Sequence, residues 1–141
     1  MMKVEREIKI SHPVDVVLQI FADPSFTIPR IFPNVNRIKV DGEKFEAEGK
    51  VALSSYHSTG RVFLGYNEVK YVYDSDKGGG VLKISKVDEN VIRITLEHEG
   101  SLLVRIGSIL RIGLITVNSN LNKLEKNINE EIRLERIKRK I

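Results

Sequence analysis

The chain has 141 residues, the length of one ordinary domain, and a chain of this length can bury a core without a metal or a disulfide. It contains no cysteine, which excludes disulfides, thiolate metal sites and thiol nucleophiles and favours a reducing, cytoplasmic location. The net charge is only +4, and much of the basic excess lies in residues 133–141, so we interpret it as a solvated helix end and expect no nucleic-acid partner.

The N-terminal segment predicts one strand followed by two short helices. Residues 3–10 alternate apolar and charged side chains, with Arg6 as the one polar residue on the inward face. Ser11 and Pro13 then predict a helix start, with the serine as its cap and the proline in its first turn. A second short helix is expected over residues 25–32.

Strand signals dominate the middle of the chain. The turn-forming residues between them are Asp, Asn and Gly, and the run Gly78 to Gly80 is interpreted as a mobile turn. Strands joined by such short turns pair antiparallel. Six strands are predicted, over residues 35–40, 44–53, 56–66, 68–74, 81–87 and 91–99.

The C-terminal part of the chain has a helical period. Apolar residues recur at steps of three and four over residues 114–137, which predicts a helix about 36 Å long. Such a helix can cross the concave face of a sheet of six or seven strands. Gly107 and Gly113 predict a bend or a break near its start.

The apolar run over residues 101–112 has two interpretations. Its leucines, isoleucines and glycines suit a lid over a cavity, and they suit ordinary core packing equally well. Arg105 and Arg111 interrupt the longer apolar stretch 101–117, so we expect no membrane-spanning helix.

The element order is β, α, α, six strands and a long α. It predicts an α+β fold in which a curved antiparallel sheet wraps around the C-terminal helix and leaves an internal apolar cavity. Local patterns that accompany this order are the strand 4–10 followed by Ser-His-Pro, Phe-Ala-Asp-Pro at 21–24, Ile-Phe-Pro-Asn-Val at 31–35, Gly-Ser-Leu-Leu at 100–103 and Asn-Leu-Asn-Lys-Leu-Glu at 120–125.

In this order and these patterns the chain resembles the START-like, or Bet v 1-like (SRPBCC), helix-grip superfamily, and the polyketide cyclase/CoxG-like branch is suggested. The resemblance implies a single START-like ligand-binding domain over residues 1–141 with a hydrophobic cavity. The superfamily includes lipid carriers, hormone receptors, cyclases, oxygenase subunits and co-chaperones, so the resemblance does not imply one particular activity.

The histidines are the first candidates for acid–base chemistry. Three histidines without ligand spacing predict neither a metal site nor a cofactor. His57 is expected at the surface. His98 falls on the inward face of strand 91–99, and it is either a buried histidine bonded to a neighbour or a candidate for ligand binding and acid–base catalysis.

The tyrosines suggest a polar lining for the cavity. Tyr71 and Tyr73 alternate against charged residues, which places both phenols on the concave face. Tyr56 and Tyr66 are expected to face the same way, although Phe63 on the opposite parity leaves that strand open to either interpretation. The candidate ligand-binding residues are Phe45, Val51, Tyr56, Val62, Leu64, Tyr71, Tyr73, Ile94, Leu96, His98, Val117, Leu121 and Leu124.

Three hypotheses for the function follow. The leading one is a binding protein that sequesters or transports a hydrophobic, lipid- or polyketide-like small molecule, as a monomer or homodimer. The second is a polyketide cyclase- or dehydratase-like enzyme that uses His98 or a tyrosine as acid or base. The third is a protein- or RNA-interaction module that uses the basic tail at residues 136–140. The abundance of Ile, Val, Lys, Arg and Glu is typical of a protein from a hot-growing organism.

Overall fold

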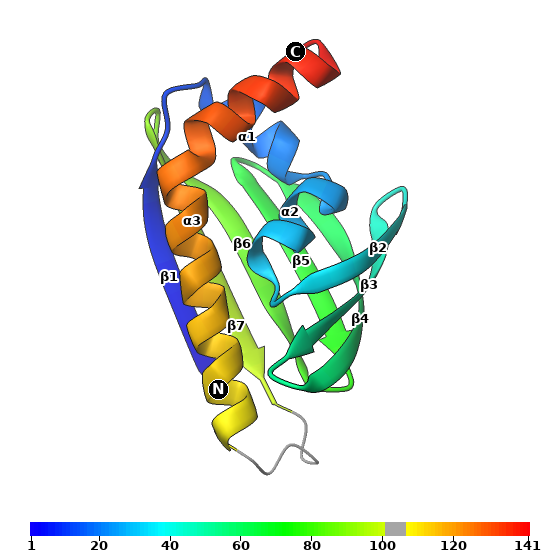
Figure 1. The fold of residues 1–141 in the computed structure, drawn as a ribbon. Helices are drawn as coiled ribbons and strands as arrows, with labels where there is room; N and C mark the ends of the chain where they lie inside the picture. Colours follow the sequence, from blue (N-terminus) through cyan, green and yellow to red (C-terminus); the bar gives the residue numbers. More distant parts are fainter. Residues whose placement is uncertain (101–106) are drawn as a thin grey trace.

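The computed structural model describes residues 1–100 and 107–141. It confirms the predicted order of one strand, two short helices, six strands and a long helix (Figure 1). The elements are β1 (Met2–Lys9), α1 (Val14–Phe21), α2 (Pro24–Ile31), β2 (Val35–Asp41), β3 (Lys44–Val51), β4 (Ser54–Gly65), β5 (Glu68–Ser75), β6 (Gly79–Asp88), β7 (Val91–Glu99) and α3 (Gly107–Arg139).

The strands form one curved antiparallel sheet in the order β1-β7-β6-β5-β4-β3-β2. Strands β2 to β7 follow one another as hairpins, whereas β1 pairs with β7, so that Met2 lies opposite His98. Gly42, in the turn between β2 and β3, has a φ of +60°, a conformation that glycine adopts without steric cost. The sheet therefore has β1 and β2 as its edges.

The concave face of the sheet is its apolar face. Burial alternates strictly along β3, where Phe45, Ala47 and Val51 are buried and the charged residues between them are exposed. Helix α1 packs against β5 and β6, and α2 packs against β2 and β3. The two short helices therefore cover part of the concave face, and α3 lies across another part (Figure 1).

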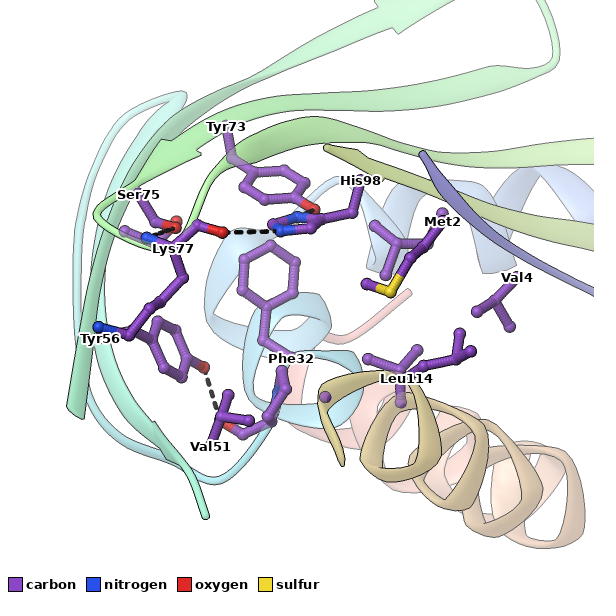
Figure 2. A pocket seen from close by; sticks show the side chains of 15 residues that line it. Met2, Val4, Phe32, Val51, Tyr56, Tyr73, Ser75, Lys77, His98 and Leu114 are labelled. Carbon is purple, nitrogen blue, oxygen red and sulfur yellow. Dashed lines mark hydrogen bonds between the residues drawn. The ribbon is translucent and has the colours of Figure 1, made fainter. Parts of the chain in front are cut away.

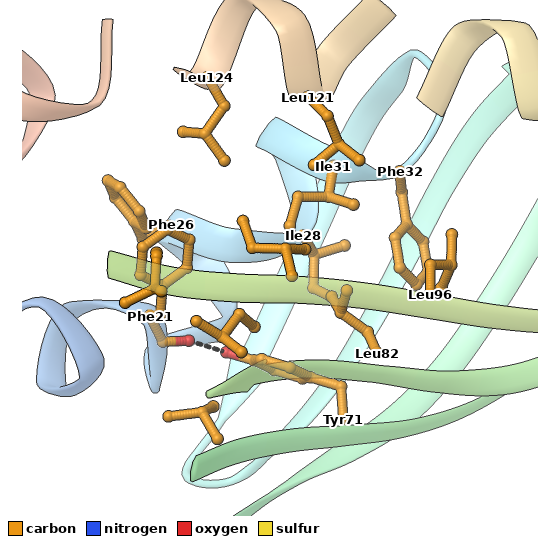
Figure 3. Packing of buried hydrophobic residues seen from close by; sticks show 14 of the residues in the cluster. Phe21, Phe26, Ile28, Ile31, Phe32, Tyr71, Leu82, Leu96, Leu121 and Leu124 are labelled. Atoms are coloured by element: carbon orange, nitrogen blue, oxygen red, sulfur yellow. Dashed lines mark hydrogen bonds between the residues drawn. The ribbon is translucent and has the colours of Figure 1, made fainter. Parts of the chain in front are cut away.

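The deepest packing lies where α1 and α2 meet the middle of the sheet (Figure 3). The rings of Phe21 and Phe26 meet edge to face with centroids 5.3 Å apart. The carbonyl of Phe21 accepts hydrogen bonds from the hydroxyl groups of Thr27 and Tyr71, both at 2.6 Å. This part of the concave face is a filled core.

The apolar stripe predicted for the C-terminal helix is confirmed. Arg6, the polar residue on the inward face of β1, donates to Asn122 at 2.6 Å and to Glu125 at 3.1 Å on α3. The charged side chain of Arg6 thus meets polar partners along the edge of the helix and does not enter the apolar core. The buried members of the stripe are Val117, Leu121, Leu124, Ile128 and Ile132, and burying each contributes about 1.5–3 kcal/mol.

The structure changes two local predictions about helix starts. Helix α1 has Pro13 at its N-cap position and no side-chain cap. Ser11 lies two residues before this position, and its backbone amide donates to Asn129 Oδ1 at 2.9 Å, which ties the loop to α3. Helix α3 begins at Gly107 and continues through Gly113, so the glycine at 113 does not break it.

The glycine-rich turn before β6 is shorter than predicted. Gly78, with a φ of +106°, lies in a turn, but Gly79 and Gly80 are the first residues of β6, so the interpretation was wrong for these two. Residues 101–106 of the predicted lid lie outside the described residues. Within the part of the chain that the structure describes, no helix is both long and apolar enough to span a membrane.

Candidate functional site

A cavity of about 80 Å³ lies between the concave face of the sheet and the N-terminal half of α3 (Figure 2). Its walls come from five strands, from the end of α2 and from α3. Most of the wall is apolar, with Val4, Phe32, Val51, Leu96, Leu114 and Val117 as its main side chains. The polar side chains of the wall are Tyr56, Ser58, Tyr73, Ser75, Lys77 and His98.

The polar end of the cavity is organised around Tyr73 and His98. The Tyr73 hydroxyl lies 2.8 Å from His98 Nδ1, and the two rings stack with centroids 5.8 Å apart. His98 Nε2 lies 3.0 Å from the carbonyl oxygen of Lys77. A histidine, a phenol and a backbone carbonyl therefore form one hydrogen-bonded chain at the cavity wall (Figure 2).

Burial sets the protonation of this pair. It lowers the pKa of His98 below its ordinary value of 6.5, although the hydrogen bond to the Lys77 carbonyl acts in the opposite direction. Burial also raises the pKa of Tyr73, and the charge that Tyr56 would carry adds to this effect. Both side chains are therefore neutral near pH 7.

Gly80 allows this pair to form. Tyr73 on β5 and His98 on β7 both lie opposite Gly80 on the intervening strand β6. Strands β5 and β7 are two strand spacings, about 10 Å, apart, and the side chains of the strand between them usually fill the space above it. Because Gly80 has no side chain, the phenol and the imidazole reach over it, and a Cβ placed there would lie 2.9 Å from the Tyr73 hydroxyl.

The remaining hydroxyl groups in the wall are bonded to backbone carbonyls. Tyr56 donates to Pro33 at 2.5 Å, and burial raises the pKa of this phenol. Gly49 leaves space for this bond, since a Cβ there would lie 2.6 Å from the Tyr56 hydroxyl. Ser58 donates to the carbonyl of Asp74 at 3.1 Å, and Ser75 donates to that of Gly78 at 2.6 Å.

A second hollow, of about 230 Å³, lies among residues of β2, β3 and β4 and the loop after β5. Its lining includes the exposed residues Glu48, Ser55 and His57. A hollow lined by such exposed polar side chains offers little apolar burial to a ligand. The cavity beneath α3 is therefore the candidate site.

Comparisons with known proteins agree with this architecture. A family model described only as "-like:-like" matches residues 2–141, so the chain belongs to that family. The hypothetical protein from Sulfolobus tokodaii is 51% identical, with a TM-score of 0.90 over 98% of this chain and 99% of that chain. No curated protein matches the chain.

Two further solved structures are similar in fold. The Zhui aromatase/cyclase from Streptomyces sp. R1128 has a TM-score of 0.65 at 15% identity, over 96% of this chain and 95% of that chain. Ginseng major latex-like protein 151 from Panax ginseng has a TM-score of 0.53 at 11% identity, over 88% and 97%. At these identities the similarity shows the fold alone: the chain has the helix-grip fold, a curved antiparallel sheet with a long C-terminal helix.

The helix-grip cavity brings together about half of the candidate residues from the sequence. Those that line it are Val51, Tyr56, Tyr73, Leu96, His98 and Val117. The others, apart from Leu64, are buried in the filled part of the core: Phe45, Val62, Tyr71, Ile94, Leu121 and Leu124. The alternation of side chains along each strand predicted which face these residues share. It could not predict which part of that face is hollow.

Two residues of β4 and its turn do not face inward as predicted. Leu64 is 71% exposed, because the end of β4 extends beyond the part of the sheet that the helices cover. Tyr66 is 95% exposed, because it lies in the turn after β4. His57 lies at the surface as expected, with its Nε2 2.9 Å from Glu46.

Sequence reasoning missed several residues of the wall. Ser75 and Lys77 follow Tyr71 and Tyr73 at the same spacing of two, so continuing the alternation beyond the predicted strand end would have found them. Phe32 follows α2 directly and carried no separate signal. Across residues 1–100 and 107–141, no three His, Asp or Glu side chains gather in a way that could hold a metal ion.

Proposed function

We propose that the protein binds a small apolar molecule, without chemical change, in the cavity beneath α3. The observation that carries this proposal is the composition of the cavity wall, in which apolar side chains face one polar end built on Tyr73 and His98. Small-molecule sites commonly have this construction, because apolar burial supplies affinity and a few polar groups orient the ligand.

The cavity volume restricts the ligand. About 80 Å³ is roughly half of the ~150 Å³ of an engineered apolar cavity that binds benzene. A compact ligand, such as a five-membered ring or a short branched chain, suits this volume. A lipid- or polyketide-like ligand would place only one ring or chain end inside a cavity of this volume.

A second candidate function is acid–base catalysis of the polyketide cyclase or dehydratase kind. The hydrogen-bonded pair of Tyr73 and His98 in the cavity wall favours it. Both nitrogens of His98 already have partners within the protein, however, so catalysis would require one of these hydrogen bonds to open. Non-covalent binding requires no such step and remains the leading proposal.

The interaction-module hypothesis receives less support. Arg136 donates to the carbonyl of Ile141, and Arg139 donates to Asp23 at 2.7 Å and to Glu135 at 2.9 Å. Two of the basic side chains in the tail thus already have partners within the chain, whereas a docking surface for an acidic partner needs free cations.

Native mass spectrometry of the purified protein, followed by solvent extraction, tests the proposal. We expect a stoichiometric adduct that is released unchanged, and we expect its loss in Val117→Phe, whose larger side chain would occupy the cavity. Release of a compound that differs from the one added would favour the enzyme. A protein that purifies empty and shows no chemical-shift change at the cavity wall with any small ring compound would refute ligand binding here.

A further inference from the structure

The hydroxyl groups of the cavity wall have no proton left to offer a ligand. Three of the four donate to backbone carbonyls: Tyr56 to Pro33, Ser58 to Asp74 and Ser75 to Gly78. A hydroxyl group has one proton, so each of these oxygens can only accept a further hydrogen bond. The fourth hydroxyl, on Tyr73, depends on the state of His98.

The Lys77 carbonyl fixes the tautomer of His98. A carbonyl oxygen only accepts, so the proton on the imidazole must be on Nε2, which lies 3.0 Å from it. In the neutral ring, Nδ1 is then a lone pair, and the Tyr73 hydroxyl must donate to it across 2.8 Å. The phenol proton is therefore held by the histidine, and the lone pairs of the Tyr73 oxygen remain unused.

The remaining polar side chains do not add a hydrogen-bond donor for a ligand in the cavity. The Lys77 ammonium group carries protons, but it pairs with the half-exposed carboxylate of Asp76, 3.6 Å away. Among the described residues, the one buried side-chain nitrogen or oxygen without a hydrogen-bond partner is Arg93 Nε. Arg93 pairs with Glu5 and Glu7 along the outer face of the sheet, away from the cavity.

We infer that the cavity selects neutral ligands that donate a hydrogen bond, such as alcohols, phenols and heteroaromatic N–H groups, over ligands of the same shape that only accept. The inference rests on the proposed function and adds to it the chemical class of the ligand. An acceptor-only ligand would place its lone pairs against those of the hydroxyl oxygens, whereas a donor finds a hydrogen bond ready.

The matched probes are pyrrole and furan. Both are five-membered aromatic rings of nearly equal shape, but pyrrole presents an N–H donor and furan presents an oxygen acceptor. Each is titrated into the full-length protein at pH 7.5, and binding is followed by NMR at the methyl groups of Val51, Leu96 and Val117. We expect pyrrole to bind roughly two- to tenfold more tightly than furan, the effect of one neutral hydrogen bond.

Two variants test the assignment of the proton. His98→Leu removes the acceptor that holds the Tyr73 proton, so the phenol can donate into the cavity, and the preference for pyrrole should shrink or reverse. Tyr73→Phe removes the phenol but exposes the His98 Nδ1 lone pair, so the preference for pyrrole should persist. Both variants are first checked for a native-like amide spectrum.

The outcomes separate this inference from the proposed function. If furan binds as tightly as pyrrole or more tightly, or if Tyr73→Phe comes to prefer furan, the donor selectivity is refuted while ligand binding stands. If neither ring shifts the cavity methyl groups at millimolar concentration, ligand binding in this cavity is refuted, and the inference about its selectivity fails with it.

Discussion

The substitution Val117→Ile tests whether the space beneath α3 is empty. Val117 is buried and faces the cavity, so the added methyl group enters unfilled space rather than its neighbours. Burying one further carbon contributes about 0.8 kcal/mol. Filling all 80 Å³ would contribute about 2 kcal/mol at ~24 cal/mol per Å³, which sets the upper limit. We expect the free energy of unfolding to rise by about 0.5–1 kcal/mol.

The matched control is Val17→Ile. Val17 is fully buried on α1 and does not line the cavity, so the same added methyl group meets close-packed neighbours. Overpacking of this kind costs about 1–3 kcal/mol. Urea denaturation at constant pH measures both changes, with an unchanged m-value as the sign that the unfolded state is unaffected. If both variants lose stability to the same extent, the region around Val117 is already filled and our reasoning about the cavity is wrong.

Three further measurements probe the cavity wall and the core beside it. Since burial depresses the pKa of His98, its contribution to stability is present above pH 6.5 and is lost as the pH falls from 6.5 toward the folded pKa; His98→Gln should flatten this part of a stability-against-pH curve. Gly80→Ala should destabilise the fold by at least about 1 kcal/mol and separate Tyr73 from His98 in NMR spectra, whereas Gly65→Ala, whose Cβ would meet Glu68 only at ordinary van der Waals distances, should change stability by less than about 0.5 kcal/mol. Tyr71→Phe should lower the free energy of unfolding by about 1 kcal/mol in urea denaturation, and a loss above 3 kcal/mol would show that its hydroxyl has a larger role than one hydrogen bond.

Periodicity predicted most of the fold because each element has one face in the core. The alternation in β3 and the apolar stripe on α3 arise because one face of each element is buried, and the structure confirms both. Helix starts were less predictable, because a boundary can shift by one or two residues. Helix α1 begins at Val14, so Pro13 occupies the N-cap position and Ser11 lies outside the helix.

The site was only partly predictable. It depends on which residues of neighbouring strands lie opposite one another, as well as on which face of its strand each side chain occupies. Parity placed Tyr73 and His98 on the concave face, but their hydrogen bond exists because both lie opposite Gly80. That alignment follows from the hairpin connections and could not be read from any single strand. The position of the hollow depends on how α3 crosses the sheet, which periodicity does not specify.

The pairing of β1 with β7 has a consequence for how the protein reaches its folded state. The first strand of the chain must wait for residues 91–98 before it finds its partner, and closing so long a loop slows folding. Met2 and Val4 from β1, Leu96 and His98 from β7 and Val117 from α3 meet only at this last stage. Until then the nascent chain carries an unpaired strand and an uncovered apolar face. Both features favour aggregation, so we expect the protein to be vulnerable to it during synthesis.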